Sequence, residues 1–208
     1  MTERLLVCTD LAKRFGGVQA LDGVSFQIDR NAIYGLIGPN GAGKTTLFNL
    51  LTGIYTPDGG KIQFAGSAMA GLSPDRVCER GIARTFQNIR LFANLSVLEN
   101  VMIGRHVRTK SGVFGAVFRT RSTRVEEAAI ERRANELLGY VGLADRANDI
   151  AKSLPYGEQR RLEIARALAT EPKLLALDEP AAGMNSTEKS ALGELIKQTA
   201  GLLLPDEI

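Results

Sequence analysis

The sequence has 208 residues, of which 44% are hydrophobic, so it can form one sizeable core or a core with a small additional lobe. Its 26 basic and 23 acidic residues give a net charge of only +3, which argues against a dedicated nucleic-acid-binding protein. No apolar run approaches the roughly 18 residues of a membrane-spanning helix, and Cys8 and Cys78 are expected to be free thiols.

The N-terminal part of the chain predicts a series of short strands. Four apolar runs have the length and composition of strands, namely residues 5–9, 24–28, 33–37 and 61–64. Asp22-Gly23 and Arg30-Asn31 are expected to form the turns between the first three.

A glycine-rich loop follows the third of these runs and fits the phosphate-binding pattern G-x-x-x-x-G-K-[ST] without a mismatch. Its residues are Gly38, Pro39, Asn40, Gly41, Ala42, Gly43, Lys44, Thr45 and Thr46. The glycines let successive backbone N–H groups wrap an anion, and a helix N-terminus after the loop adds partial positive charge. Lys44 is expected to reach the outer phosphates and Thr45 to bind Mg²⁺. A chance glycine-rich turn is the alternative, which the apolar run before the loop and the helix-compatible run after it disfavour.

The next segments predict helices and one further strand. Residues 74–80 have a helix start, with Ser73 as N-cap and Pro74 in the first turn, and residues 82–86 have a strand pattern. Ser96 and Glu99 form a capping-box pattern at the start of a helix. Helical patterns over the remaining chain cover residues 96–105, 125–140, 156–169 and 186–199, the last with Ser186 as its cap.

A basic stretch at residues 104–125 contains Arg and Lys but no Asp or Glu. It has two interpretations, a solvated flexible loop or a surface that faces acidic lipid headgroups or a partner near the membrane.

A second candidate site follows the apolar run at residues 173–177, where the sequence continues with Asp178 and Glu179. Carboxylates at the end of a buried strand are expected near the phosphate loop, because ligands gather at the carboxyl ends of parallel strands. Asp178 is expected to hold Mg²⁺ through water, and Glu179 to polarise the attacking water as general base. A plain turn at the end of a strand is the alternative for this pattern alone.

The glycine at the start of the helix at 156–169 marks a further anion site, and here the sequence resembles a known family. Residues 154–168 resemble the signature segment of ATP-binding-cassette (ABC) ATPases, and the order of phosphate loop, Gln87, signature and Asp178-Glu179 is theirs. Within that family, the sequence is most similar to the ATP-binding subunit of bacterial branched-chain amino-acid importers. The segments that carry this similarity are residues 15–18, 84–88, 95–101 and 156–165, with the basic insertion.

The resemblance implies an α/β fold, the P-loop NTPase fold of ABC-type ATPases. It implies a single domain over residues 1–208, with an N-terminal antiparallel β subdomain, a parallel-sheet core and a helical subdomain. The core and β subdomain are expected at about 1–89 and 166–208, and the helical subdomain at about 90–165. Family members continue into another strand that ends in a histidine, whereas this sequence stops after residues 205–208. The C-terminal part of the core is therefore expected to be missing, with hydrolysis weakened by about 10²–10³.

The resemblance also implies the roles of site residues, with ATP and Mg²⁺ as cofactors. Phe15 is expected to stack on the adenine ring, although an ordinary core role is the alternative. Gln87 is expected to contact Mg²⁺ or the water and to couple the site to the membrane subunits, and Gln87 and Glu179 are the expected catalytic residues. Residues that would reach the nucleotide of an opposite subunit are Leu154, Pro155, Tyr156, Gly157, Glu158 and Gln159. Residues 182–185 are expected in a loop at the dimer interface.

Two residues depart from the family pattern. Pro155 stands where many signatures have a serine that meets the γ-phosphate, and Asn185 stands where the interface loop usually has an aspartate. Backbone N–H groups at Gly157 and the helix dipole could still hold the phosphate, so the first change is expected to tune the site.

The expected function is the ATP-binding subunit of an ABC importer that takes up branched-chain amino acids. Its expected partners are a second ABC ATPase subunit, identical or different, transmembrane permease subunits and, indirectly, a solute-binding protein, but not nucleic acid. The expected location is the cytoplasmic face of the inner membrane, through the permease. The alternatives are a nucleotide-binding fragment with little ATPase activity and a non-transport ABC ATPase.

Overall fold

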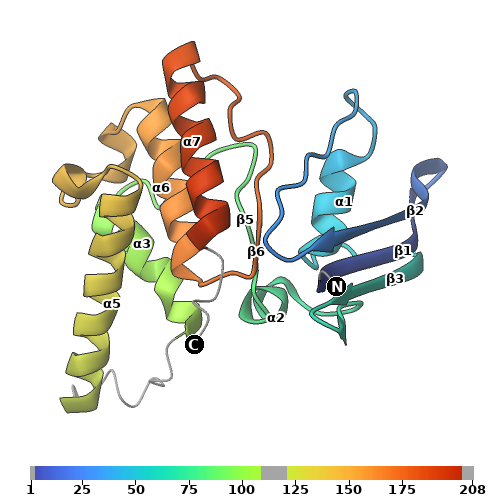
Figure 1. Cartoon of the computed structure of the whole chain (residues 1–208), viewed down its shortest axis with the longest axis horizontal. Coiled ribbons are helices and arrows are strands. Elements are labelled where there is room, and N and C mark those ends of the chain that lie inside the picture. Colours follow the sequence, from blue (N-terminus) through green and yellow to red (C-terminus); the bar gives the residue numbers. More distant parts are fainter. Residues whose placement is uncertain (1–2, 109–120, 203–208) are drawn as a thin grey trace. The chain divides into compact units, whose positions relative to one another are not determined.

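The computed structural model of the chain describes residues 3–108 and 121–202 and divides into two compact units (Figure 1). Unit 1 comprises Met1–Arg80 and Ile196–Ile208, and unit 2 comprises Gly81–Leu195. The predicted boundaries of the core and helical subdomains stay a prediction. The basic insertion falls largely on residues 109–120, outside the described residues.

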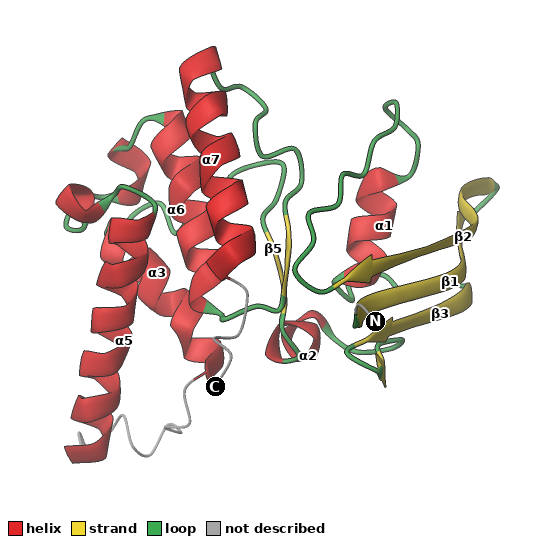
Figure 2. Cartoon of the chain, in the orientation of Figure 1, coloured by secondary structure: helices red, strands yellow, loops and turns green. Residues whose placement is uncertain are grey.

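A four-stranded antiparallel sheet forms the frame of unit 1, in the order β2-β1-β3-β4 (Figure 2). Its strands are β1 (Arg4–Phe15), β2 (Val18–Asp29), β3 (Gly59–Phe64) and β4 (Ser67–Ala68). Buried side chains of β1 and β3 form the core, and five are at most 2% exposed: Leu6, Cys8, Leu11, Ile62 and Phe64. Unit 1 also contains the helices α1 (Lys44–Leu51) and α2 (Pro74–Glu79).

The first hairpin turn lies at Gly16-Gly17. The sequence predicts this turn at Asp22-Gly23. Phe15 pairs with Val18, so only two residues connect β1 to β2. Gly16 has φ +55°, which a tight turn of this kind favours. Asp22-Gly23 lies inside β2 instead, and the predicted turn there is wrong because β2 continues to Asp29.

The apolar run at residues 33–37 is not a strand, which corrects the expectation for the segment before the phosphate loop. None of the residues that the structure describes forms a ladder with it, and the side chain of Ile37 is 95% exposed. An apolar run becomes a strand only where a neighbouring strand pairs with its N–H and C=O groups. The glycine loop and the helix after it form as expected.

Unit 2 combines a parallel strand pair with a group of helices. The strands β5 (Ile82–Arg84) and β6 (Leu174–Ala176) pair in parallel, with Ala83 opposite Leu175. The helices are α3 (Val97–Arg105), α5 (Arg121–Tyr140), α6 (Tyr156–Ala169) and the part of α7 (Ser186–Leu202) that ends at Leu195, with short 3-10 turns at His106–Arg108, Ala144–Arg146 and Ala151–Ser153. α3, α5 and α6 pack against one another around buried side chains that include Val97, Val101, Leu137, Leu138, Leu162 and Leu168.

Most of the predicted helices and strands are confirmed. α6 has the predicted bounds, and α2, α3, α5 and α7 differ from prediction by a few residues at their ends.

Cys8 and Cys78 are free thiols, and burial raises the pKa of the Cys8 thiol to about 12. Within residues 3–108 and 121–202, no helix combines the length and the apolar character that a bilayer crossing requires.

The start of α3 has the predicted capping box. The Ser96 hydroxyl accepts a hydrogen bond from the Glu99 amide at 3.1 Å, and the Glu99 carboxylate accepts one from the Ser96 amide at 2.7 Å. We expect Ser96→Ala to lower the free energy of unfolding by about 1 kcal/mol, measured by urea denaturation. Ser73→Ala is the matched control, because Ser73 caps α2 without a side-chain hydrogen bond to its backbone. Equal losses in the two variants would contradict this role of the capping box.

Candidate functional site

The phosphate loop of unit 1 leads directly into α1. Gly43 is the N-cap of α1 with φ +83°, and no side chain caps the first turn. The first backbone N–H groups of the helix are therefore donors for an anion, because an α-helix leaves its first amides without intrahelical partners. The Lys44 ammonium donates hydrogen bonds to the carbonyl oxygens of Gly38 at 2.5 Å and Pro39 at 2.9 Å, so its charge lies at the loop.

Gly43 is required by both its conformation and its surroundings. A Cβ atom at this position would lie 2.5 Å from the backbone oxygen of Ala20 and 2.8 Å from Cδ2 of Leu21. We expect Gly43→Ala to weaken ATP binding at least about tenfold, because a left-handed alanine costs about 1–2 kcal/mol before the clash is counted. Titration with a fluorescent ATP analogue measures this change. Gly17→Ala is the control, since a Cβ there meets nothing within 4 Å, and an unchanged affinity in Gly43→Ala would contradict the assignment.

Phe15 lies at the end of β1 with a partly exposed ring. Its ring meets that of Tyr55 edge to face, with 5.1 Å between the centroids, and the Lys13 ammonium lies 5.6 Å from its centroid. Phe15 is 42% exposed, so it is not the ordinary core residue of the alternative interpretation. An aromatic ring that is partly exposed can stack on a planar base.

In unit 2, two of the predicted catalytic residues meet. The side-chain amide of Gln87 donates a hydrogen bond to a carboxylate oxygen of Glu179 at 3.0 Å. Gln87 follows β5 and Glu179 follows β6, so the parallel pairing of these strands brings the two side chains together. Glu179 has φ +46°, a conformation that non-glycine residues rarely adopt and that is typical of functional sites.

Asp178 lies beside them in a buried ion pair. Its carboxylate is 2.8 Å from the guanidinium of Arg84, and these side chains are 8% and 5% exposed. Arg84 is the last residue of β5 and its guanidinium also lies 5.1 Å from the centroid of the Phe86 ring. Sequence reasoning gave Arg84 no role in the site. The sequence feature that could have identified Arg84 is its charge at the end of the apolar run Ile82-Ala83, because a buried charge at such a position must be paired.

The segment that resembles the ABC signature leads into α6. Pro155 is its N-cap and offers no side-chain cap, so the first amides, including that of Gly157, are donors for an anion. The Gln159 side chain donates to the Leu154 carbonyl at 2.8 Å. Glu158 adds a carboxylate to the first turn, 3.7 Å from the Arg161 guanidinium.

The predicted interface loop at residues 182–185 contacts this segment. A Cβ at Gly183 would lie 3.2 Å from the Tyr156 ring, and one at Gly157 would lie 2.6 Å from the Glu188 carboxylate.

The residue that caps α7 is Asn185 and not Ser186, so the predicted cap at Ser186 is wrong. The Asn185 side chain accepts from the Glu188 amide at 2.9 Å, and Glu188 accepts from the Asn185 amide at 3.0 Å. The expected interface loop is thus held by a reciprocal cap.

The candidate residues therefore form two groups, one in each unit. Unit 1 contains the phosphate loop with Lys44 and Thr45 and, at the end of β1, Phe15. Unit 2 brings Gln87, Asp178 and Glu179 together and places residues 182–185 against the start of α6. The predicted Mg²⁺ ligands Thr45, Gln87 and Asp178 offer hydroxyl, amide and carboxylate oxygens, the donor set that Mg²⁺ prefers.

The sequence matches the family model described as "ABC transporter" over residues 21–182. It is 44% identical over 198 residues to the high-affinity branched-chain amino acid transport ATP-binding protein LivG of Salmonella typhimurium, an alignment that covers 95% of this chain and 78% of LivG. It is 42% identical to the corresponding protein BraF of Pseudomonas aeruginosa, with 94% and 77% covered.

Solved structures agree with these matches. The ADP conformation of MJ1267, an ATP-binding cassette of an ABC transporter, superposes with a TM-score of 0.83 at 30% identity. The superposition covers 98% of this chain and 79% of that one. The cbiO1 protein from Clostridium perfringens, part of the ABC transporter complex cbiONQ, gives a TM-score of 0.81 at 28% identity, with 97% and 75% covered.

Proposed function

Because the chain belongs to the ABC transporter family, we propose that it is the ATP-binding subunit of an importer that takes up branched-chain amino acids. The observation that carries the enzymatic part of this proposal is the 3.0 Å hydrogen bond between Gln87 and Glu179. A carboxylate at the end of a parallel strand, beside a polar side chain that can orient water, is the arrangement that hydrolysis of a bound nucleotide needs.

The phosphate loop and Phe15 bind the nucleotide in this proposal. Backbone N–H groups of residues 38–46 and the ammonium of Lys44 hold the phosphates, and the ring of Phe15 stacks on the adenine. The Thr45 hydroxyl and the Gln87 side chain would hold Mg²⁺ directly and Asp178 would hold it through water, and the metal would neutralise phosphate charge there. Glu179 accepts the proton of the attacking water, which Gln87 orients.

A second ATPase subunit completes the site. The start of α6, with residues 154–159, presents amide donors and a helix N-terminus suited to a phosphate held by the opposite subunit. Binding of ATP then closes the two subunits, and hydrolysis reopens them. Transmembrane permease subunits hold the pair at the cytoplasmic face of the inner membrane and receive the motion.

The test is reconstitution with the permease subunits and solute-binding protein of the same importer in proteoliposomes. We expect ATP-dependent uptake of labelled leucine and hydrolysis that rises when the solute-binding protein is loaded. Binding of ATP without turnover or uptake would instead support the alternative of a nucleotide-binding chain with little activity. Failure to assemble with any permease, together with normal hydrolysis, would favour a non-transport ATPase.

A further inference from the structure

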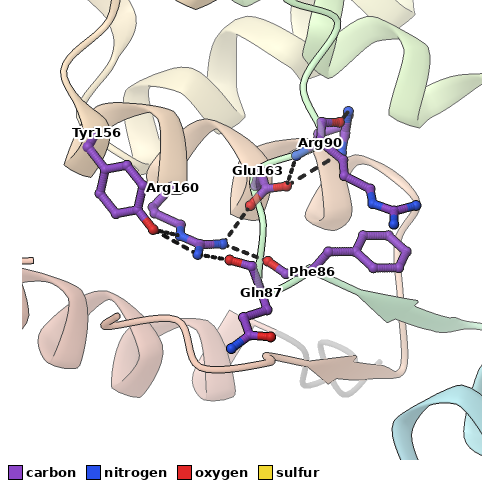
Figure 3. Close-up of polar contacts among 7 residues, drawn as sticks. Phe86, Gln87, Arg90, Tyr156, Arg160 and Glu163 are labelled. Carbon is purple, nitrogen blue, oxygen red and sulfur yellow. Dashed lines mark hydrogen bonds and ion pairs between the residues drawn. The ribbon is translucent and has the colours of Figure 1, made fainter. Parts of the chain in front are cut away.

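The backbone that carries Gln87 has no regular secondary structure. Residues 85–92 connect β5 to the segment before α3 and belong to no helix or strand. The hydrogen bond from Gln87 to Glu179 nevertheless requires this backbone to be held in one place. Side chains of α6 form hydrogen bonds to the backbone of Phe86, Gln87 and Arg90 within it (Figure 3).

Arg160 holds the first half of this segment. Its guanidinium donates to the carbonyl oxygen of Phe86 at 2.6 Å and to that of Gln87, and it also donates to the Tyr156 hydroxyl at 2.9 Å (Figure 3). A planar guanidinium holds its N–H groups in a fixed fork, so it can bond to two successive carbonyls and to the Tyr156 hydroxyl in one defined geometry, whereas the donors of a lysine ammonium rotate on a flexible stem.

Glu163 holds the other end. One carboxylate oxygen accepts from the Arg90 amide at 2.8 Å, and the other pairs with Arg160 at 3.1 Å. Arg166 adds a bond to the Arg90 carbonyl at 2.6 Å. These three α6 residues follow one another at intervals of three, so they lie on one face of the helix and reach both ends of residues 86–90.

The ion pair between Arg160 and Glu163 is buried, and its contribution to stability alone does not explain it. The side chains of Arg160 and Glu163 are 3% and 1% exposed. A buried ion pair loses much of its Coulombic gain to desolvation, and apolar replacements of similar volume are often as stable. Directional bonds to three backbone groups are what an apolar pair cannot provide.

We propose that the buried Arg160–Glu163 pair is a clamp that fixes residues 86–90 on the start of α6 and thereby positions the Gln87 side chain at Glu179. Gln87 and the first turns of α6 then move as one body. In the proposed function, on which this role in catalysis rests, Arg160 and Glu163 are positioning residues that act through Gln87.

The test uses a double variant that carries both Arg160→Met and Glu163→Leu, and it is compared with the native chain. Both changes are made together because either one alone leaves a buried charge without its partner. We expect the thermal midpoint to fall by no more than about 10 °C, because relief of desolvation partly offsets the lost backbone bonds, while the Arg90 amide exchanges its hydrogen about tenfold faster or more. We expect kcat for ATP hydrolysis to fall about 10- to 100-fold with KM for ATP unchanged, since a displaced positioning group slows the chemical step. The single variant Arg160→Lys should also lower kcat, because lysine lacks the planar fork of the guanidinium.

Two controls separate positioning from a general effect. Arg133→Met with Glu136→Leu removes an exposed ion pair of the same spacing on α5 and should change neither exchange at residues 86–92 nor kcat. In a Gln87→Ala background, the clamp variant should lower kcat no further, because both changes remove the same interaction.

Each outcome decides the proposal. A clamp variant with native exchange at Arg90 and, where the native chain hydrolyses ATP, native kcat would overturn it, as would additive losses in the Gln87→Ala background. The exchange measurement needs no ATP hydrolysis. A native chain without turnover would therefore count against the proposed function, while fast exchange at Arg90 in the variant alone would still support the clamp.

Discussion

Glu179→Gln should lower the rate of ATP hydrolysis by about 10²–10³ while ATP binding is retained. The amide keeps the size of the carboxylate and can still bond to Gln87, but it cannot accept the proton of the attacking water. Binding should persist because the phosphate loop lies in another part of the sequence. Phosphate release measures the rate, and titration with a fluorescent ATP analogue measures the affinity.

Glu171→Gln is the matched control for this prediction. Glu171 also has a left-handed backbone, with φ +49° compared with +46° at Glu179, but it precedes β6 whereas Glu179 follows it, and its carboxylate pairs with Arg105. We expect its hydrolysis rate to equal that of the native chain. A similar loss in both variants would mean that the strained backbone, not the carboxylate, governs the rate.

Arg84→Met should lower the free energy of unfolding by about 3–5 kcal/mol, because it leaves the buried carboxylate of Asp178 without its charged partner. Urea denaturation measures this loss. The double change of Arg84→Met and Asp178→Asn should recover much of the stability, since it removes both charges together. Recovery would show that the unpaired charge, and not the lost arginine stem, is responsible.

Arg133→Met provides the comparison for Arg84. Arg133 forms an ion pair with Glu136 at 2.9 Å, but these side chains are 36% and 53% exposed. Its removal should change stability by less than about 1 kcal/mol, because water screens exposed pairs. Equal losses at the two positions would contradict the assignment of Asp178 as a buried charge that depends on Arg84.

Sequence reasoning worked best where local chemistry determines structure. The bounds of α6 and the capping box of α3 follow from helical spacing and from Ser96 and Glu99, which are signals within a few residues. The family order of motifs predicted Gln87 and Glu179 as catalytic residues but not their hydrogen bond, whose physical basis is the pairing of β5 with β6.

The sequence did not predict features that depend on residues far apart along the chain. Residues 33–37 have a strand-like composition, but a strand also needs a pairing partner, which composition does not reveal. Arg160 and Glu163 have the spacing of an ordinary exposed i,i+3 pair, and only the segment 86–90 that covers them makes them a buried pair. Arg84 was overlooked for the same reason, since its partner Asp178 lies 94 residues away.

The contact between Phe15 and Tyr55 has an optical consequence. The sequence contains no tryptophan, so its intrinsic emission comes from tyrosine alone. Tyr55 is 38% exposed, and its ring touches the aromatic residue proposed to stack on adenine. Tyr55→Trp would place a single tryptophan at that position, and its emission would report the arrival of a nucleotide at Phe15 in real time.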